Sequence, residues 1–273
     1  MSLSNIQLER YSRNILVKEI GLEGQKKLLN SKVMIIGAGG LGSPAALYLA
    51  SAGVGTIGIV DYDKIDLSNL QRQILHSTSK IGELKSESAK ESLISLNPDL
   101  NIITHNKLVS EKNILNLIKD YDFILDCTDN IQSKFLINDA CVILKKPFTH
   151  AGVIRFNGQL MTVIPGESPC YRCIFQDVPN ENSVQTCKQV GVIGAAVGVI
   201  GSLQALEAIK YLTSTGELLT GNLLTFDALT MNFRKIKLPK RNHNCKVCGE
   251  NPSINLQNLF DNKISLLLKS NLE

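Results

Sequence analysis

Two CxxC pairs contain four of the seven cysteines, and they are the residues best suited to bind a metal. They are Cys170-Tyr171-Arg172-Cys173 and Cys245-Lys246-Val247-Cys248. At this spacing one turn directs two thiolates to one ion, and four thiolates complete the tetrahedral shell of zinc. A redox-active CxxC would need only one pair, and two pairs rarely arise by chance. Because four protein ligands leave no open position, we expect a structural Zn²⁺ site that joins the C-terminal segment to the middle of the chain.

The other three cysteines differ in their surroundings. Cys127 follows an apolar run and Cys141 lies in an apolar helical pattern, so we expect both to be inert core thiols. Cys187 lies in a polar stretch and precedes an apolar helix. Lys188 and a helix N-terminus would each lower the pKa of the Cys187 thiol and favour the thiolate. The residues alone do not decide between a chemical role and an ordinary loop cysteine.

A glycine-rich loop fits the pattern GxGxxG at residues 37–42. It lies between a predicted strand at 32–36 and a predicted helix that ends near Ala52, which is the context the motif requires. The helix N-terminus offers free N–H groups to a phosphate, and Asp61, at the end of a predicted strand at 56–60, could bind a ribose. These features predict a nucleotide site without naming the nucleotide. A nicotinamide-dependent dehydrogenase has the same loop and acid, and glycines that serve only packing are a second alternative.

Polar side chains crowd the segment that follows Asp61, with the sequence DYDKIDLSNLQRQ. Lys85 opens a predicted helix at 85–96, and Asp129 lies in the segment DCTDN after a predicted strand at 123–125. Ligands of open α/β sheets bind at the carboxyl ends of the parallel strands, so we expect these residues and the glycine loop to line one cleft. Basic groups and a strand-end aspartate suit a triphosphate with Mg²⁺. Taken singly, each could be a solvated surface residue, and Asp129 could be a helix N-cap.

Strands alternate with amphipathic helices through the first two thirds of the chain, which predicts a parallel sheet with crossover helices. Strand patterns at 158–165 and 223–238 flank a long apolar helix at 190–211. We expect antiparallel strands that continue the same sheet. The predicted fold class is therefore α/β: a Rossmann-like nucleotide-binding domain whose parallel strands are continued by antiparallel strands in one mixed sheet, with a structural zinc site made of four cysteines.

The composition is globular, with 273 residues of which 44% are hydrophobic and 20% charged. A net charge of +4 is too small to indicate a nucleic-acid partner. The first residues mix acidic and basic side chains and do not resemble a targeting segment, so we expect a cytoplasmic protein. Residues 190–206 are uncharged, but glycines and Gln204 dilute them, and we expect a buried helix and no membrane partner.

Taken together, these motifs resemble the ThiF/MoeB/HesA family of adenylyltransferases, which are ubiquitin-activating-enzyme-like proteins that activate sulfur carrier proteins. The similarity covers about residues 7–253, which we predict to be one domain with a nucleotide-binding half (1–150) and a carrier-binding and zinc half (151–253). Residues 254–273 form a predicted tail. The matching segments, in order, are YSRNI (11–15), GAGGLGSP (37–44), YLASAGVG (48–55), DYDKIDLSNLQRQ (61–73), DCTDN (126–130), CYRC (170–173), GVIGSLQALEAIK (198–210) and CKVCG (245–249).

The resemblance implies ATP- and Mg²⁺-dependent adenylylation of the C-terminal glycine of a small ubiquitin-like sulfur carrier ending in Gly-Gly, with release of pyrophosphate. The pathway would be the biosynthesis of thiamine or of molybdopterin. It also implies a homodimer and a separate sulfur donor, such as a cysteine desulfurase or a rhodanese, because no rhodanese-like domain follows the second CxxC pair. The alternatives are an NAD-dependent Rossmann oxidoreductase and a carrier-binding scaffold without turnover.

The resemblance also assigns roles to single residues. Asp61 would hold the ribose, Arg13 would reach into the neighbouring site of a homodimer, and Asp129 would bind Mg²⁺ or help to place the carboxylate. Cys187 matches a crossover-loop cysteine that takes part in sulfur transfer in some members. The phosphates would be approached by Gly39, Gly40 and Gly42 and surrounded by Asn69, Arg72, Gln73 and Lys85, and the zinc ligands would be Cys170, Cys173, Cys245 and Cys248.

Overall fold

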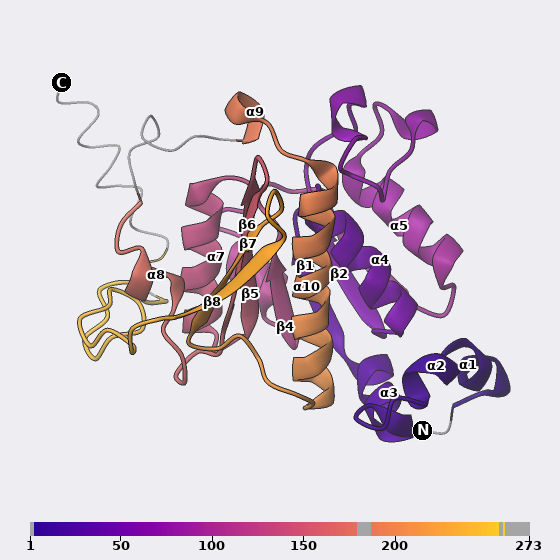
Figure 1. The fold of residues 1–273 in the computed structure, drawn as a ribbon, viewed down its shortest axis with the longest axis horizontal. Helices are drawn as coiled ribbons and strands as arrows, with labels where there is room; N and C mark the ends of the chain where they lie inside the picture. The colour runs from indigo at the N-terminus through magenta and orange to yellow at the C-terminus, as the bar shows by residue number, and fades with distance from the viewer. Residues whose placement is uncertain (1–2, 179–186, 257–258, 260–273) are drawn as a thin grey trace.

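The computed structural model describes residues 3–178, 187–256 and 259, without the side chains of 187 and 188. Its centre is one eight-stranded sheet in the order β3-β2-β1-β4-β5-β6-β7-β8 (Figure 1). The first five strands in this order are parallel, and β6 to β8 continue the sheet antiparallel. This confirms the predicted fold class. The strands are β1 (Lys32–Ile36), β2 (Thr56–Val60), β3 (Asn101–His105), β4 (Phe123–Asp126), β5 (Phe148–Ile154), β6 (Asn157–Val163), β7 (Asn222–Asp227) and β8 (Asn232–Lys237).

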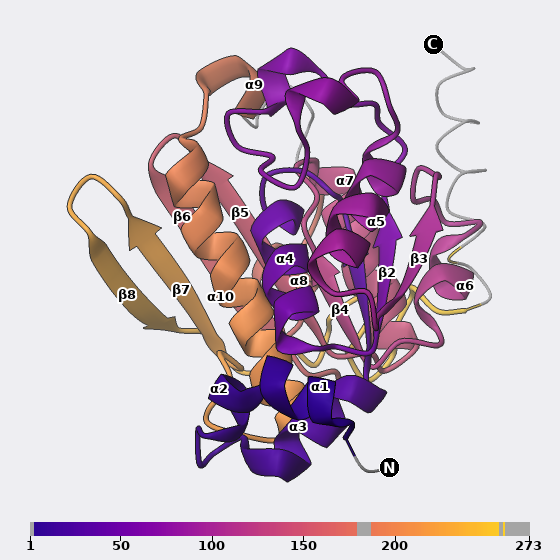
Figure 2. The same ribbon diagram turned by 90° about the vertical axis from the view of Figure 1, so that its right-hand side faces the viewer.

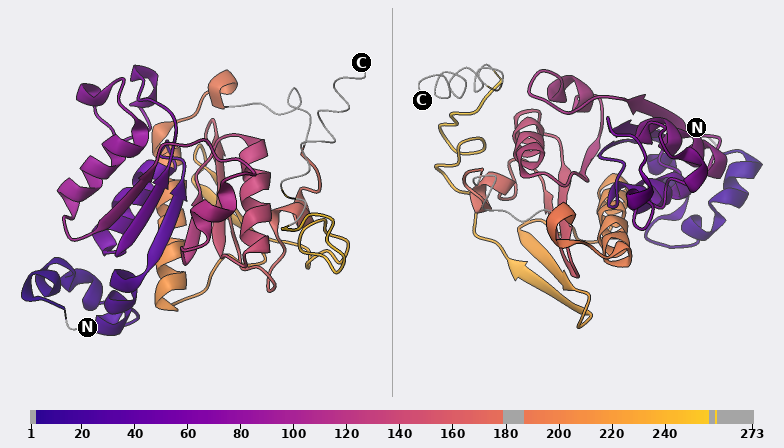
Figure 3. Two further views of the ribbon diagram at one scale, coloured as in Figure 1. Left: turned by 180° about the vertical axis from the view of Figure 1, so that it is seen from behind. Right: turned by 90° about the horizontal axis from the view of Figure 1, so that it is seen from above.

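Helices cover both faces of the parallel part of the sheet, which explains why its strands are apolar on both sides. Val33 and Ile35 of β1 pack into one buried cluster with α4 (Gly42–Ala52), α5 (Lys85–Leu96) and α10 (Gly194–Thr213). Met34 and Ile36 pack into another with α6 (Ile114–Ile118) and α7 (Ile131–Ile143). Seen from above, α7 and α10 lie on opposite sides of the strands (Figure 3).

Short helices complete the described chain. Those at the N-terminus lie at the amino ends of the parallel strands (Figure 2). Their bounds are α1 (Asn5–Arg10), α2 (Ser12–Ile15) and α3 (Gly21–Asn30), and the others are α8 (Tyr171–Ile174), α9 (Cys187–Val190) and the two 3₁₀ turns η1 (Leu67–Asn69) and η2 (Thr78–Lys80).

The long apolar helix begins at Gly194 and not at 190. Gly191 has a φ of +79°, which ends the short helix α9, and Ile193 is extended before α10 starts. Within the described ranges, α10 is long and apolar enough to cross a membrane, but half of it is buried inside the protein. Gln204 donates to the Asp126 carbonyl oxygen (2.9 Å) and to Thr149 Oγ1 (3.1 Å). We therefore assign α10 as a core helix, as the sequence predicted.

Candidate active site and metal site

A cavity of about 1070 Å³ lies at the carboxyl ends of the parallel strands and extends along β5, β6 and β7. One end is lined by the glycine loop, and the other by Gly152, Asn157 and Thr225 on the antiparallel part of the sheet. Motifs that are far apart in the sequence therefore share one site. Of the predicted site residues, those that line the cavity are Gly39, Gly40, Asp61, Arg72, Gln73, Lys85 and Asp129.

The glycine loop is shaped by two positions that exclude a side chain. Gly37 has a φ of +101°, and a Cβ there would lie 2.8 Å from the carbonyl oxygen of Cys127. A Cβ on Gly42 would overlap the carbonyl oxygen of Gly37. Gly42 does not line the cavity, so the structure gives it a packing role between loop and helix. No side chain caps the start of α4. The Ser43 N–H donates to the Gly39 carbonyl oxygen (2.9 Å), the Ala45 N–H to the Leu41 carbonyl oxygen (3.4 Å), and Pro44 has no N–H, so of the first turn of α4 only the N–H of Gly42 is left for an anion.

Asp61 ties the end of β2 to the glycine loop. Its Oδ2 accepts a hydrogen bond from the backbone N–H of Ala38 (2.8 Å), and its Oδ1 accepts one from Asp63 (2.9 Å). Burial raises the pKa of Asp61, and the positive charge of Lys85 opposes that rise. Each carboxylate oxygen can accept a second hydrogen bond, so Asp61 can still accept from a ribose at the cavity.

Gln73, Lys85 and Arg72 form the wall beside the glycine loop. Lys85 is buried, and its Nζ donates to Asp63 Oδ2 (2.9 Å), whereas Arg72 donates to the Ser68 carbonyl oxygen (3.0 Å). Gln73 is also buried, but its Oε1 has no hydrogen-bond partner in the described chain. Leaving a buried polar atom unpaired costs about 1–3 kcal/mol. A polar ligand that donates to Gln73 would recover that energy, so these residues fit a nucleotide.

Besides Gly42, the predicted residues Asn69 and Arg13 also lie outside the cavity lining. Asn69 ends η1, and its carbonyl oxygen accepts from the N–H groups of Arg72 (3.1 Å) and Gln73 (3.0 Å). Asn69 therefore orders the backbone that presents these two side chains. Arg13 is exposed on α2, at the end of the sheet away from the cavity (Figure 2). Its predicted role stays a prediction that requires a second copy of the chain.

A buried network of hydrogen bonds and charged groups, centred on Asp126, lies beneath the cavity wall. The sequence motifs did not predict it. Asp126 is fully buried, and its Oδ1 accepts from the Thr128 N–H (3.0 Å) and Oγ1 (2.6 Å). Its Oδ2 lies 2.7 Å from His150 Nδ1 and 3.4 Å from Lys134 Nζ. Burial favours a higher pKa of Asp126, but Lys134, His150 and Thr128 together hold that pKa well below its ordinary value. DCTDN contains Asp126, but no sequence signal pointed to its two partners.

His150 should make the stability of the fold depend on pH. Burial and the charge of Lys134 lower the pKa of His150, although Asp126 opposes this shift. The unfolded chain therefore binds more protons than the folded chain below a pH of about 6.5, so the free energy of unfolding should fall as the pH decreases through that value. Urea unfolding between pH of about 7.5 and 5.5 measures this slope. His150→Gln should make it less steep without removing it, because burial also lowers the pKa of His76 and of His105, whereas His243→Gln, at an exposed histidine, should leave it unchanged. An unchanged slope in His150→Gln would contradict the assignment.

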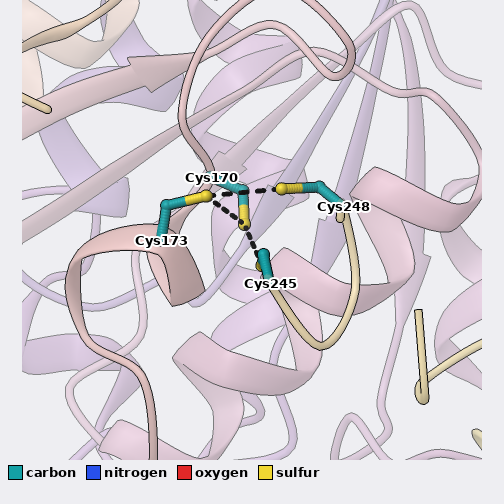
Figure 4. Close-up of side chains that lie close together, drawn as sticks. All are labelled: Cys170, Cys173, Cys245 and Cys248. Carbon is teal, nitrogen blue, oxygen red and sulfur yellow. Dashed lines mark hydrogen bonds between the residues drawn. The ribbon is translucent and has the colours of Figure 1, made fainter. Parts of the chain in front are cut away.

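The four paired cysteines converge on one point (Figure 4). The Sγ–Sγ distances are 3.9 Å for Cys170–Cys173, 3.6 Å for Cys170–Cys245 and 3.4 Å for Cys173–Cys248. Tetrahedral zinc with Zn–S bonds of about 2.3 Å separates its sulfurs by about 3.8 Å. The backbone N–H of Asn242 also donates to Cys173 Sγ (3.4 Å). This donor set could hold a metal ion, and it links α8 to the C-terminal segment, which lies beside α8 in Figure 1.

Of the three remaining cysteines, two lie where the sequence predicted them, and the side chain of the third is not described. Cys127 and Cys141 are buried, as predicted, and burial raises the pKa of both thiols. Cys187 begins α9, but its side chain lies outside the described residues. Its role in sulfur transfer stays a prediction, and so does the structure of most of the tail 254–273.

The sequence of the chain was compared with models of known protein families. The model of the ThiF family matches residues 11–247 of the chain. The chain belongs to the ThiF family. This match includes the glycine loop, DCTDN and three of the four paired cysteines, and it confirms the family predicted from the motifs.

Relatives within the ThiF family are enzymes by name. The proteins called adenylyltransferase and sulfurtransferase MOCS3 from Drosophila yakuba and Aedes aegypti are each 46% identical to this chain over 252 residues. These alignments cover 92% of the chain and 56% and 58% of the relatives, so the chain spans little more than half of their length. The names support the predicted enzyme class, an adenylyltransferase.

Solved structures agree with the ThiF fold. The structure of E. coli MccB with ATP is 26% identical to this chain, with a TM-score of 0.79 over 91% of the chain and 75% of MccB. MccB with AMPCPP and MccA is also 26% identical, with a TM-score of 0.77 over 88% of the chain and 74% of MccB. These likenesses confirm the fold, and the ligands of these two complexes are those of MccB.

Proposed function

We propose that this chain uses ATP to adenylylate the C-terminal glycine of a small ubiquitin-like sulfur carrier that ends in Gly-Gly, and releases pyrophosphate. The main observation behind the proposal is that one cavity has two ends with different linings. Its glycine-loop end fits a nucleotide, and its β5–β7 end, lined by glycines and by both polar and apolar side chains, offers a groove to an extended polypeptide. A nucleotide and a polypeptide C-terminus can therefore meet inside it. The names of the MOCS3 relatives and of the MccB complexes point to the same chemistry.

The proposed reaction is an attack of the carrier's carboxylate on the α-phosphate of ATP. One carboxylate oxygen forms the new P–O bond, the bond from the α-phosphate to the bridging oxygen breaks, and pyrophosphate leaves with the electron pair. The carboxylate is already a nucleophile, so no general base is needed. The work of the protein is to position the reactants and to neutralise charge. Arg72 and Lys85 would stabilise the phosphate charge, Asp61 would hold the ribose, and Gly39 and Gly40 would let the backbone approach the phosphates.

Two metals belong to the proposal. Asp129 is exposed on the cavity wall, and its carboxylate suits Mg²⁺, which neutralises the charge of the triphosphate when it is bound. We propose Zn²⁺ for the four-cysteine site, because all four ligands come from the protein and the sulfur spacing fits a closed tetrahedral shell.

The partners and the setting are further parts of the proposal. We expect the carrier to serve thiamine or molybdopterin biosynthesis and a separate sulfur donor to complete the thiocarboxylate. We also propose a homodimer in which Arg13 of one copy reaches the cavity of the other, because Arg13 is exposed and far from its own cavity. Free buried thiols such as Cys127 suit the reducing cytoplasm.

Carrier-dependent exchange of labelled pyrophosphate into ATP tests the proposed activity. We expect exchange with a cognate carrier that ends in Gly-Gly, and none without a carrier. A carrier with an amidated C-terminus is the matched control, because it lacks only the carboxylate and should give no exchange. Carrier binding without exchange would contradict the proposed activity and favour a scaffold. NAD(H) binding in place of ATP binding would favour the oxidoreductase.

A further inference from the structure

A buried lysine lines the cavity between its two ends, and none of the sequence motifs assigns it a role. Lys134 lies in the first turns of α7 and is 9% exposed. Its Nζ donates to the carbonyl oxygen of Ala151 (2.7 Å) and contacts Asp126 Oδ2 (3.4 Å). An ammonium group has three N–H donors, so one remains for a ligand in the cavity.

The position of this ammonium group is fixed by its surroundings. Asp126 is held from its other side by Thr128 and lies 2.7 Å from His150, so it is a rigid partner for Lys134. The side-chain amide of Gln204, on α10, donates to the carbonyl oxygen of Asp126 and so holds the backbone of Asp126 in place. Residues of β4, β5 and α10 therefore fix the position of the Lys134 ammonium group and the direction of its third N–H. This donor is preorganised before a ligand binds.

The location of Lys134 indicates which anion it would meet. The glycine-loop end of the cavity already has the positive charges of Arg72 and Lys85. Lys134 lies instead where β5 enters the cavity, since its acceptor Ala151 precedes the cavity-lining Gly152. A polypeptide that runs along β5 toward the nucleotide brings one negative charge to this point, which is its terminal carboxylate.

We propose that Lys134 binds the C-terminal carboxylate of the carrier and orients it toward the nucleotide. The inference rests on the proposed function, because it requires a carrier tail in the cavity. The third N–H of Lys134 holds one carboxylate oxygen, and the other oxygen stays free to attack phosphorus. Asp126 positions Lys134 and does not itself contact the substrate.

A two-by-two binding experiment tests this contact directly. The carrier is prepared with a terminal carboxylate and with a terminal amide, and calorimetry measures its affinity for the wild-type protein and for Lys134→Met. In the wild type, amidation should weaken binding about tenfold or more, as expected for loss of a charge-assisted hydrogen bond. In Lys134→Met, both carriers should bind with equal affinity to within about twofold. Such non-additivity identifies residues in contact.

A matched control separates the contact from a general loss of charge. Lys107 also lines the cavity but is exposed, and Lys107→Met should keep the tenfold penalty for amidation. The same penalty in Lys134→Met would overturn the proposal. So would a Lys134→Met variant whose affinity for AMPCPP falls while its preference for the carboxylate carrier is unchanged, because Lys134 would then be a phosphate ligand.

Two further variants of Lys134 and the pyrophosphate-exchange assay complete the test. If Lys134→Met does not fold, Lys134→Gln removes the charge and retains a donor for Ala151, and it should lose the preference for the carboxylate. Lys134→Arg should keep much of that preference. Pyrophosphate exchange is scored separately. If the wild-type protein catalyses exchange but binds both carriers equally well, only the role of Lys134 is contradicted. If the wild-type protein prefers the carboxylate carrier but catalyses no exchange, only the proposed activity is contradicted.

Discussion

Replacing Asp129 with alanine should lower carrier-dependent pyrophosphate exchange by about a thousandfold, which is the scale of losing one fixed charge-stabilising group in an active site. The side chain is exposed on the wall of the cavity that would hold both substrates. Without this carboxylate, the proposed Mg²⁺ would lose the protein ligand that we assign to it. The rate should fall because the negative charge on the phosphate oxygens would be less well neutralised in the transition state. Initial exchange rates at saturating ATP and carrier measure the effect.

The fold should tolerate this replacement. Asn130, and not Asp129, is the N-cap of α7, because its side chain accepts the hydrogen bond from the Ser133 N–H (2.8 Å). The melting temperature of Asp129→Ala should therefore stay within about 2 °C of the wild type. Asp99→Ala, at an exposed aspartate far from the cavity lining, is the control and should exchange normally. Exchange in Asp129→Ala within about threefold of the wild type would show that Asp129 has no catalytic role.

Loss of the Zn²⁺ that we propose for the four-cysteine site should destabilise the C-terminal half more than any single packing change. The site joins α8 to the segment around Cys245, and zinc bound by thiolates contributes on the order of 10 kcal/mol to the folding of small zinc domains. Val247 and Ile254 are buried beside the cysteines, so release of the segment also exposes apolar surface. Cys245→Ser should abolish the bound zinc and lower the melting temperature by about 10 °C or more.

Zinc content and melting temperature have to change together for this account to hold. Elemental analysis should find one zinc per chain in the wild type and none in Cys245→Ser. Cys141→Ser is the control, because this buried thiol lies outside the four-cysteine cluster and should leave the zinc content at one per chain. A metal-free wild type with an unchanged melting temperature would contradict a structural metal site.

Much of the fold followed from patterns that are local in the sequence. The apolar runs at β1, β2 and β4, and the helical spacing of α5, depend on neighbouring residues alone. Strand β5 escaped prediction because Thr149, His150 and Gly152 interrupt its apolar pattern. These polar residues are tolerated because β5 pairs on both sides and its side chains reach Asp126 and Gln204.

The candidate site divides in the same way. Gly39, Asp61 and Lys85 could be placed because each follows or opens a predictable element at the same edge of a parallel sheet. The contact of Lys134 with Asp126 and Ala151 could not be placed, because it depends on how α7 packs on β4 and β5. Gly42 illustrates the same limit, since only the folded loop shows that its hydrogen faces the Gly37 carbonyl and not the cavity.

The central claim is that a carrier carboxylate and ATP react inside one cavity, and mass spectrometry of the carrier tests it most directly. The wild-type protein, ATP, Mg²⁺ and a carrier ending in Gly-Gly are mixed with pyrophosphatase, and the intact carrier is weighed after rapid acid quenching. We predict a carrier species heavier by one adenylyl group, absent with the amidated carrier and strongly reduced in Asp129→Ala. Consumption of ATP without that species, or the same species on the amidated carrier, would contradict the account.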